Sequence, residues 1–133
     1  MLRFPLPTIG AVNGAAIAGG FDLAVLTDIR IAAASAWFSH PERRWSDVVY
    51  RPLRELVGGS AARYLALTGR RVDAAEALAL GLVNAVVPND QLMQHVIELA
   101  TEVADAPRDV LLRAKAKIVA ATDIAADVRT LDL

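Results

Sequence analysis

The sequence predicts an α/β layered fold, because strand-like and helical segments alternate at its front and helices follow at its back. Residues 8–12 and 29–33 are short apolar runs bounded by turn residues, which is typical of buried strands. Of the 133 residues, 55% are hydrophobic and 22% are charged, so the chain can bury a real core and is neither disordered nor fibrous. This length favours one domain, or one large piece of a domain.

The front of the chain holds three predicted strands and one helix. The first strand ends at the turn pair Asn13-Gly14, and a small, glycine-rich segment over 15–20 follows it. The helix predicted over 21–27 carries apolar residues all round and is therefore expected to be buried. A second strand over 29–33 and a short third one over 37–39 come next.

Proline and glycine interrupt the middle of the chain. Pro41 pushes His40 into an extended conformation, and the polar segment 43–51 is predicted to be irregular. Two helices are expected after it. They are 52–57, stopped by Gly58-Gly59, and 60–68, capped by Ser60 and ended by Gly69.

Helical signals dominate the back of the chain. Asp73 and Glu76 form a capping-box pattern that opens a helix to residue 80, and a strand-like segment over 82–87 follows. An apolar stripe predicts a helix over 90–104, and Pro107 opens another through about residue 121. The basic side of this last helix holds Arg113, Lys115 and Lys117. The remainder to residue 133 is either a helix or a loose tail.

These elements divide the chain into an α/β part over 1–88 and a helical part over 89–133. The net charge of −1 provides no basic surplus for binding nucleic acid or an anionic membrane. No apolar run is long enough to span a bilayer, and the first residues lack the layout of a signal peptide. The absence of cysteine excludes disulfides and zinc–thiolate sites. We therefore expect a cytoplasmic protein.

The most informative segment for function is the glycine pair that precedes the first predicted helix. Gly19 and Gly20 let a ligand approach uncovered N–H groups at the positive end of the helix dipole. The Gly19 amide could thus stabilise a thioester oxygen that becomes enolate-like. Asp22, about one turn further on, could face the same pocket. The alternatives are close packing at the glycines and a carboxylate that only favours the helix dipole.

A second acidic candidate stands on a rigid corner after the third predicted strand. Glu42 follows His40-Pro41 and would form a general acid/base pair with Asp22 if the two carboxylates met across a pocket. A plain surface glutamate is the alternative. His40 either lines the site or is a hydrogen-bonded structural imidazole, and no metal-ligand spacing is present. Four arginines form either a solvated face or a contact for ligand phosphates: Arg43, Arg44, Arg51 and Arg54.

Six segments, taken together, carry a resemblance to a known family. They are PTIGAVNG (7–14), AGGFDLA (18–24), TDIRIA (27–32), FSHPE (38–42), LTGR (67–70) and AAEALALGLV (74–83). In order and spacing the chain resembles the crotonase (enoyl-CoA hydratase/isomerase) superfamily, C-terminal half only, along nearly its whole length. The resemblance implies the C-terminal part of a crotonase-like ββα-type layered fold, followed by a helical trimerisation region.

The resemblance also implies roles for individual residues. Gly19 matches the glycine whose amide forms one half of the family's oxyanion hole. Asp22 matches the first catalytic carboxylate, which is usually glutamate in hydratases, and Glu42 matches the second. Gly20 and His40 are expected to contact the substrate, an acyl-CoA thioester. No metal and no separate cofactor are implied, because CoA is part of the substrate.

Three departures from the family pattern limit these expectations. Asp22 is one methylene shorter than glutamate, and the usual glycine- and proline-rich loop after Glu42 is replaced by the shortened segment 43–51. The family's N-terminal half, with the other oxyanion-hole amide, has no counterpart here. We expect an enoyl-CoA hydratase or isomerase activity that this lack could impair.

Two other readings of the departures stay open. One is a truncated, non-catalytic remnant or an oligomer-assembly module, since family members form a homotrimer or hexamer through helices like those over 89–121. The other is a separate chain that supplies a complementing N-terminal half.

Overall fold

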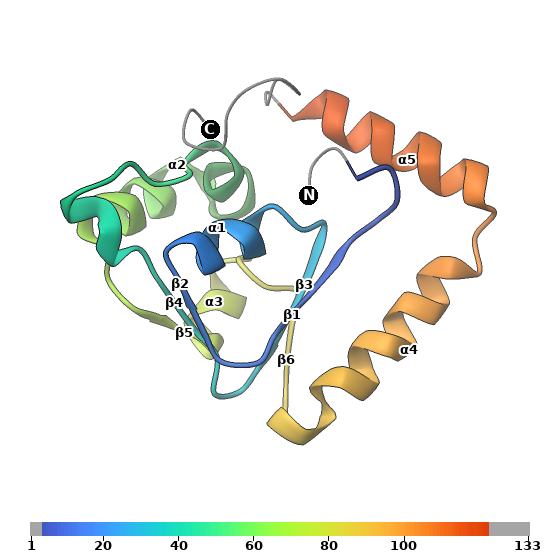
Figure 1. Ribbon diagram of the computed structural model, residues 1–133, viewed down its shortest axis with the longest axis horizontal. Helices are drawn as coiled ribbons and strands as arrows, with labels where there is room; N and C mark the ends of the chain where they lie inside the picture. The colour runs from blue at the N-terminus through green and yellow to red at the C-terminus, as the bar shows by residue number, and fades with distance from the viewer. Residues whose placement is uncertain (1–3, 123–133) are drawn as a thin grey trace.

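The computed structural model describes residues 4–122. Two three-stranded sheets form the α/β layers of this part of the chain (Figure 1). The first has the order β1-β3-β6, all parallel: β1 (Ile9–Val12), β3 (Ile29–Ala33) and β6 (Ala85–Val87). The second has the order β2-β4-β5, with β2 (Ala15–Ile17) parallel to β4 (Trp37–Ser39), and β4 antiparallel to β5 (Val72–Asp73).

Two successive passes of the chain build both sheets. β1 runs into β2 through Asn13-Gly14, and β3 runs into β4 through residues 34–36. Helix α1 (Gly19–Val25) joins the two passes, and this crossover is what allows both pairings to be parallel. Strands β2 and β4 therefore end side by side, with Ile17 opposite Ser39.

The larger apolar core lies around α1, the kinked helix α2 (Arg51–Thr68) and α3 (Ala74–Ala79). Phe21 of α1 and Phe38 of β4 are its largest fully buried side chains. Gly58 has a φ of 75° inside α2, which separates a short first helix from a longer second one, as the glycine pair predicts. At the start of α3 the Asp73 carboxylate accepts a hydrogen bond from the Glu76 N–H, as expected for a capping box.

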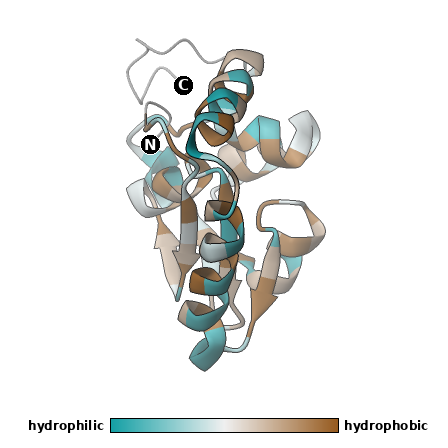
Figure 2. Ribbon diagram, turned by 90° about the vertical axis from the view of Figure 1, so that its right-hand side faces the viewer, coloured by the Kyte–Doolittle hydropathy of each residue, from teal (hydrophilic) through white to brown (hydrophobic). Residues whose placement is uncertain are grey.

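Helices α4 (Leu92–Ala104) and α5 (Arg108–Ala121) form the outer side of the molecule (Figure 1). α4 packs Leu92 and Val96 against Ile31 of β3, which makes a second, smaller apolar cluster. Figure 2 looks onto this side, where hydrophobic residues lie among hydrophilic ones. Two short 3-10 helices complete the described elements: η1 (Pro41–Arg44) and η2 (Asn89–Gln91).

The differences from the sequence prediction are local. The sequence does not predict β2 or β5, because strands of three and two residues are too short to show alternation. Helix α1 begins at Gly19 and ends at Val25, two residues earlier at each end than expected. The strand expected over 82–87 is limited to β6. The helix or loose tail expected after residue 121 falls on 123–133, outside the described residues.

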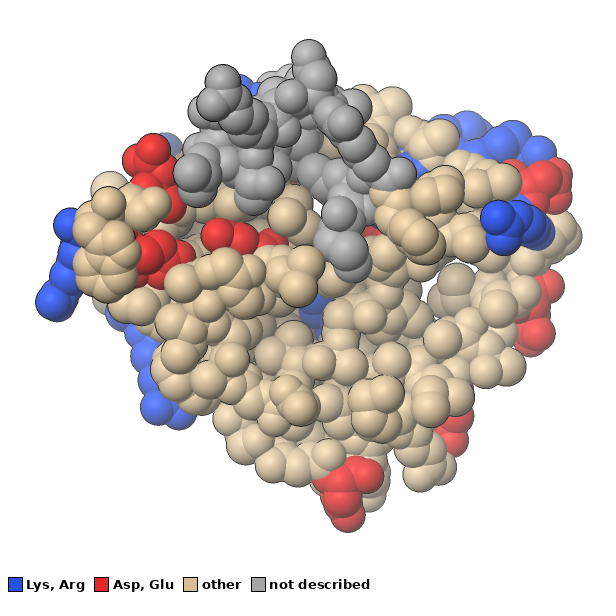
Figure 3. Space-filling view, in the orientation of Figure 1, with Lys and Arg blue, Asp and Glu red and all other residues tan. Residues whose placement is uncertain are grey.

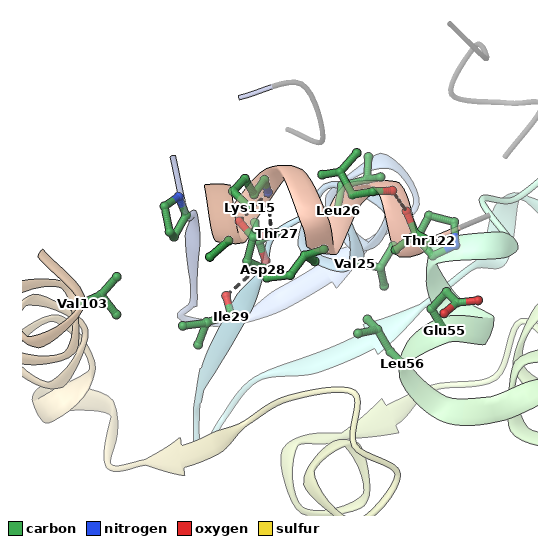
Figure 4. A pocket seen from close by; sticks show the side chains of 15 residues that line it. Val25, Leu26, Thr27, Asp28, Ile29, Glu55, Leu56, Val103, Lys115 and Thr122 are labelled. Atoms are coloured by element: carbon green, nitrogen blue, oxygen red, sulfur yellow. Dashed lines mark hydrogen bonds and ion pairs between the residues drawn. The ribbon is translucent and has the colours of Figure 1, made fainter. Parts of the chain in front are cut away.

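Lys115, which the sequence places on the basic side of the last helix together with Arg113 and Lys117, is buried. Its side chain is 3% exposed, and its ammonium group donates to both carboxylate oxygens of Asp28, 2.6 Å from Oδ2. Thr8 donates to Asp28 as well, from its N–H and its hydroxyl. Burial raises the pKa of Asp28, but the hydrogen bonds from Lys115 and Thr8 outweigh it, so the pKa lies below its usual value. This ion pair fastens α5 to the sheet (Figure 4).

The face of the molecule seen in Figure 3 has few charged side chains in its middle. Lys and Arg gather on its two sides, over η1 and α2 and over α5 (Figure 3). The four arginines singled out in the sequence are all exposed: Arg43, Arg44, Arg51 and Arg54. None of the helices between residues 4 and 122 has the length and apolar character that a membrane crossing requires.

Replacing Gly69 by alanine should destabilise the fold. Gly69 has a φ of 62° at the end of α2, and a Cβ there would lie 2.5 Å from the His40 carbonyl oxygen. We expect Gly69→Ala to lower the free energy of unfolding by about 1–3 kcal/mol in urea titrations. Gly59→Ala is the matched control, because its Cβ would come no closer than 3.9 Å to Arg54 and Arg63. Equal losses in the two variants would contradict this account.

Breaking the buried ion pair should cost far more than breaking an exposed one. Lys115→Met leaves the Asp28 carboxylate without its cation, so we expect a loss of about 3 kcal/mol in the free energy of unfolding. Arg113→Met on the same helix is the control, because Arg113 and Asp109 are 63% and 66% exposed. We expect its effect to stay within about 0.5 kcal/mol. Thermal melts that rank the two variants the other way would refute the assignment.

Acidification should remove the contribution of Asp28. Because its folded pKa is lowered, the ionised carboxylate stabilises the fold above the unfolded-state pKa of about 3.9. That contribution is lost as the pH falls through the still lower folded pKa. The stability difference between the natural chain and Asp28→Asn should therefore be constant above about pH 5 and shrink below about pH 4. Urea titrations across this range measure it, and a difference that grows on acidification would contradict it.

Candidate active site

The candidate site lies where the parallel strands β2 and β4 end. Beyond their last pair, the Ala18 N–H still donates to the Ser39 carbonyl oxygen at 3.1 Å. Ala18 then turns the chain with a φ of 54° and a ψ of −126°, a region that residues with a Cβ rarely adopt. Its carbonyl oxygen accepts from the N–H groups of Phe21 and Asp22, which starts α1. The strained turn thus directs α1 away from the end of the sheet.

The glycine pair after this turn leaves its amides uncovered. Gly19 and Gly20 are exposed, and neither N–H has a hydrogen-bond partner in the described part of the chain. A Cβ on either residue would meet open space rather than protein. Gly20 also borders a groove of about 340 Å³ between β1, β2 and α1, to which Leu23 contributes as well. A ligand could therefore reach both amides.

The structure brings Asp22, His40 and Glu42 together. His40 Nε2 lies 2.9 Å from Asp22 Oδ1 and 3.9 Å from Glu42 Oε1. One ligand-type atom from each of the three side chains lies within 4.8 Å of the other two. Asp22 comes from the first turn of α1, and His40 and Glu42 come from the end of β4 and from η1. The two carboxylates that the sequence singled out thus share one site.

Burial leaves several polar atoms of this cluster without partners. Glu42 is 8% exposed, and both of its carboxylate oxygens are buried without a hydrogen bond from any described residue. The Nδ1 atom of His40, a residue only 1% exposed, is in the same situation. An unsatisfied buried polar group costs about 1–3 kcal/mol, so such atoms usually indicate a function.

Packing fixes the imidazole of His40. Its ring stacks on Phe21 with 4.2 Å between the ring centroids and 17° between the planes. Phe21 in turn contacts Phe38 of the core at a centroid distance of 5.3 Å. The sequence left open whether His40 lines a site or is structural. The structure shows a fully buried ring bonded to Asp22, a partner 18 positions away that local sequence could not indicate.

A separate apolar cavity of about 340 Å³ lies on the far end of α1. Leu26, Leu56 and Val103 are among the side chains around it, and the Asp28–Lys115 ion pair forms one of its walls (Figure 4). None of the three clustered ionisable residues lines this cavity. The chemistry that the sequence predicts is therefore assigned to the cluster at the other end of α1.

Comparison with known proteins identifies the family. The family model for enoyl-CoA hydratase/isomerase matches residues 1–133. The chain belongs to the enoyl-CoA hydratase/isomerase family. Enoyl-CoA hydratase EchA19 of Mycobacterium tuberculosis is 41% identical over 113 residues, which cover 77% of this chain and 40% of that relative. A short-chain-enoyl-CoA hydratase of Clostridium acetobutylicum is 40% identical over 115 residues, or 83% of this chain and 44% of the relative.

Solved structures of the family share this fold. A monofunctional enoyl-CoA isomerase from M. smegmatis has a TM-score of 0.86 and 37% identity, covering 95% of this chain and 61% of that one. An enoyl-CoA hydratase from Bacillus anthracis has a TM-score of 0.87 and 34% identity, covering 93% and 50%. The predicted α/β fold and the resemblance are confirmed. The chain spans less than half the length of the two curated relatives. This agrees with the expectation that it matches only part of the family fold.

Proposed function

We propose that this chain carries the acid/base residues of an acyl-CoA site and acts on an enoyl-CoA thioester, by a double-bond shift or by water addition. The observation that carries the proposal is the meeting of Asp22 and Glu42, with Asp22 in the same first turn of α1 as the uncovered amides of Gly19 and Gly20. Family membership supports the class of reaction. The activity of the chain alone, its acyl substrate and its partners are part of the proposal.

The double-bond shift needs one base that later acts as an acid. The Glu42 carboxylate removes a proton from carbon 2 of a 3-enoyl thioester, and the electron pair of that C–H bond moves into the thioester as an enolate. The Gly19 N–H donates to the enolate oxygen. When the enolate collapses, the Glu42 carboxylic acid returns the proton to carbon 4, and the double bond lies between carbons 2 and 3. Glu42 suits this role because its oxygens accept no hydrogen bond from any residue between 4 and 122.

Water addition uses the same groups with a second carboxylate. One carboxylate takes a proton from a water molecule while the water oxygen bonds to carbon 3 of a 2-enoyl thioester. The electrons of the double bond then form the enolate. A proton delivered by the other carboxyl group to carbon 2 completes the product. Asp22 Oδ2 has no hydrogen-bond partner among residues 4–122 and is thus available to hold the water. Neither reaction needs a separate cofactor, because CoA is part of the substrate.

Glu42→Gln should abolish most of the turnover. The amide has the shape of the carboxylate but cannot carry the proton, so we expect kcat to fall by about 10²–10⁴-fold. Loss of the conjugated thioester absorbance of a 2-enoyl-CoA, or its appearance from a 3-enoyl-CoA, measures the rate. The control is Asp47→Asn, which removes an exposed carboxylate from the segment after η1 and should leave the rate unchanged. Folded natural chain with no turnover of either substrate would refute the proposal.

Assembly is a second proposal, supported by the outer helices. α4 leaves two large apolar side chains 58–59% exposed, at Met93 and Ile97, which lie one turn apart on the same helix face. We propose that this face is covered in a homotrimer or hexamer, because exposed apolar clusters commonly mark interfaces. Light scattering should give a mass of three or six chains, and Ile97→Glu should lower it. A monodisperse monomer would contradict the proposal.

A further inference from the structure

His40 presents its two ring nitrogens to very different surroundings. Nε2 faces carboxylates, with Asp22 Oδ1 at 2.9 Å and Glu42 Oε1 at 3.9 Å. Nδ1 is buried and has no hydrogen-bond partner among residues 4–122. The ring cannot turn to exchange them freely, because it stacks on Phe21 and its side chain is fully buried.

This asymmetry selects one tautomer of the neutral ring. A proton on Nδ1 would be a buried donor without an acceptor, and the bare Nε2 would then direct its lone pair at a carboxylate oxygen only 2.9 Å away. A proton on Nε2 avoids both the unpaired donor and the repulsion between lone pairs, because the Nε2–H group donates to Asp22. Only an unused acceptor then remains at Nδ1. The two environments therefore assign the proton to Nε2.

We propose that His40 is a positioning residue that donates from Nε2 to Asp22 and thereby fixes the orientation of this shortened carboxylate. The role rests on the proposed acyl-CoA chemistry. Asp22 Oδ1 is occupied by this bond, so Oδ2 is the oxygen that faces a water or a substrate. Glu42, which accepts no hydrogen bond from the described residues, is left as the carboxyl group that moves the proton. The two carboxylates thus have different tasks, set by which one the imidazole holds.

A divalent metal ion is the other ligand chemistry that this cluster could serve. Its three ligand atoms lie within 4.8 Å of one another, and carboxylates with an imidazole are common metal ligands. A metal on Nε2 would, however, require the proton on Nδ1, where metal-binding histidines almost always donate to an acceptor. Nδ1 of His40 has no such acceptor within the part of the chain that the structure describes. The geometry therefore favours positioning over metal binding.

Nitrogen NMR of the histidines tests the tautomer without any turnover. The chain has two histidines, and His95→Gln removes the signals of the other one. Long-range proton–nitrogen spectra of ¹⁵N-histidine protein should show His40 with a protonated Nε2 and a bare Nδ1. Asp22→Ala should shift the Nε2 nitrogen and proton resonances, because it removes the acceptor 2.9 Å from Nε2. Protonation at Nδ1, or a spectrum unaffected by Asp22→Ala, would overturn the proposal.

Zinc chloride separates the two ligand chemistries in the same sample. An equimolar amount should leave the His40 signals unchanged. A zinc-dependent shift of the His40 Nε2 resonance that is abolished by Glu42→Gln would mean that the cluster is a metal site. That result would refute the positioning role.

Two substitutions of His40 distinguish positioning from packing. His40→Gln keeps an N–H donor near the position of Nε2, whereas His40→Leu keeps the bulk and removes the donor. We expect His40→Leu to lower kcat by about 10²-fold with little change in KM, and His40→Gln to recover most of the loss. Circular dichroism and thermal melts check that both variants fold. Equal rates in the two variants would overturn the proposal, whereas a natural chain without turnover would refute the proposed function and leave the NMR result to decide the role of His40.

Discussion

The parallel pairing of β2 with β4 is the constraint on which the whole site depends. Because Ile17 lies opposite Ser39, the residues that follow them leave the sheet at the same edge. The bond from the Ala18 N–H to the Ser39 carbonyl oxygen extends the pairing by one step, and then the chains diverge into α1 and η1. Ligand sites in α/β proteins commonly form outside the carboxyl ends of parallel strands.

The buried cations away from the site are bonded, whereas several polar atoms of the site have no partner among the described residues. Arg30 is buried and donates to the carbonyl oxygens of Leu82 and Thr27, and Lys115 is bonded to Asp28. In the described part of the chain, buried side-chain atoms without partners belong to His40, to Glu42 and to Nε of Arg70. Buried polar atoms without hydrogen bonds are expected at functional sites, because such atoms destabilise the fold but stay available to bind a ligand. This contrast supports reading the cluster as a site rather than as poor packing.

A short stretch of chain supplies every group of the site. Residues 18–42 contain the strained turn, the two glycines, both carboxylates and the imidazole. The rest of the described chain supports them: Gly69 packs against the backbone of His40, and the Asp28–Lys115 pair fastens the outer helix to the strand that follows α1. All of these groups therefore come from one stretch of a chain that spans less than half the length of the two curated relatives.

The sequence by itself determined the α/β class, the family, the kink at Gly58 and the positions of the long helices, because glycine, capping residues and apolar periodicity act through neighbouring residues. It also singled out Gly19, Asp22 and Glu42. It did not indicate β2 and β5, which are too short to carry a pattern, or the partners of His40 and Lys115. Those partners are 18 and 87 positions away, and only the strand pairing and the packing of α5 bring them within bonding distance. Local sequence sets what each segment can become, whereas contacts between distant side chains exist only once the tertiary fold has formed.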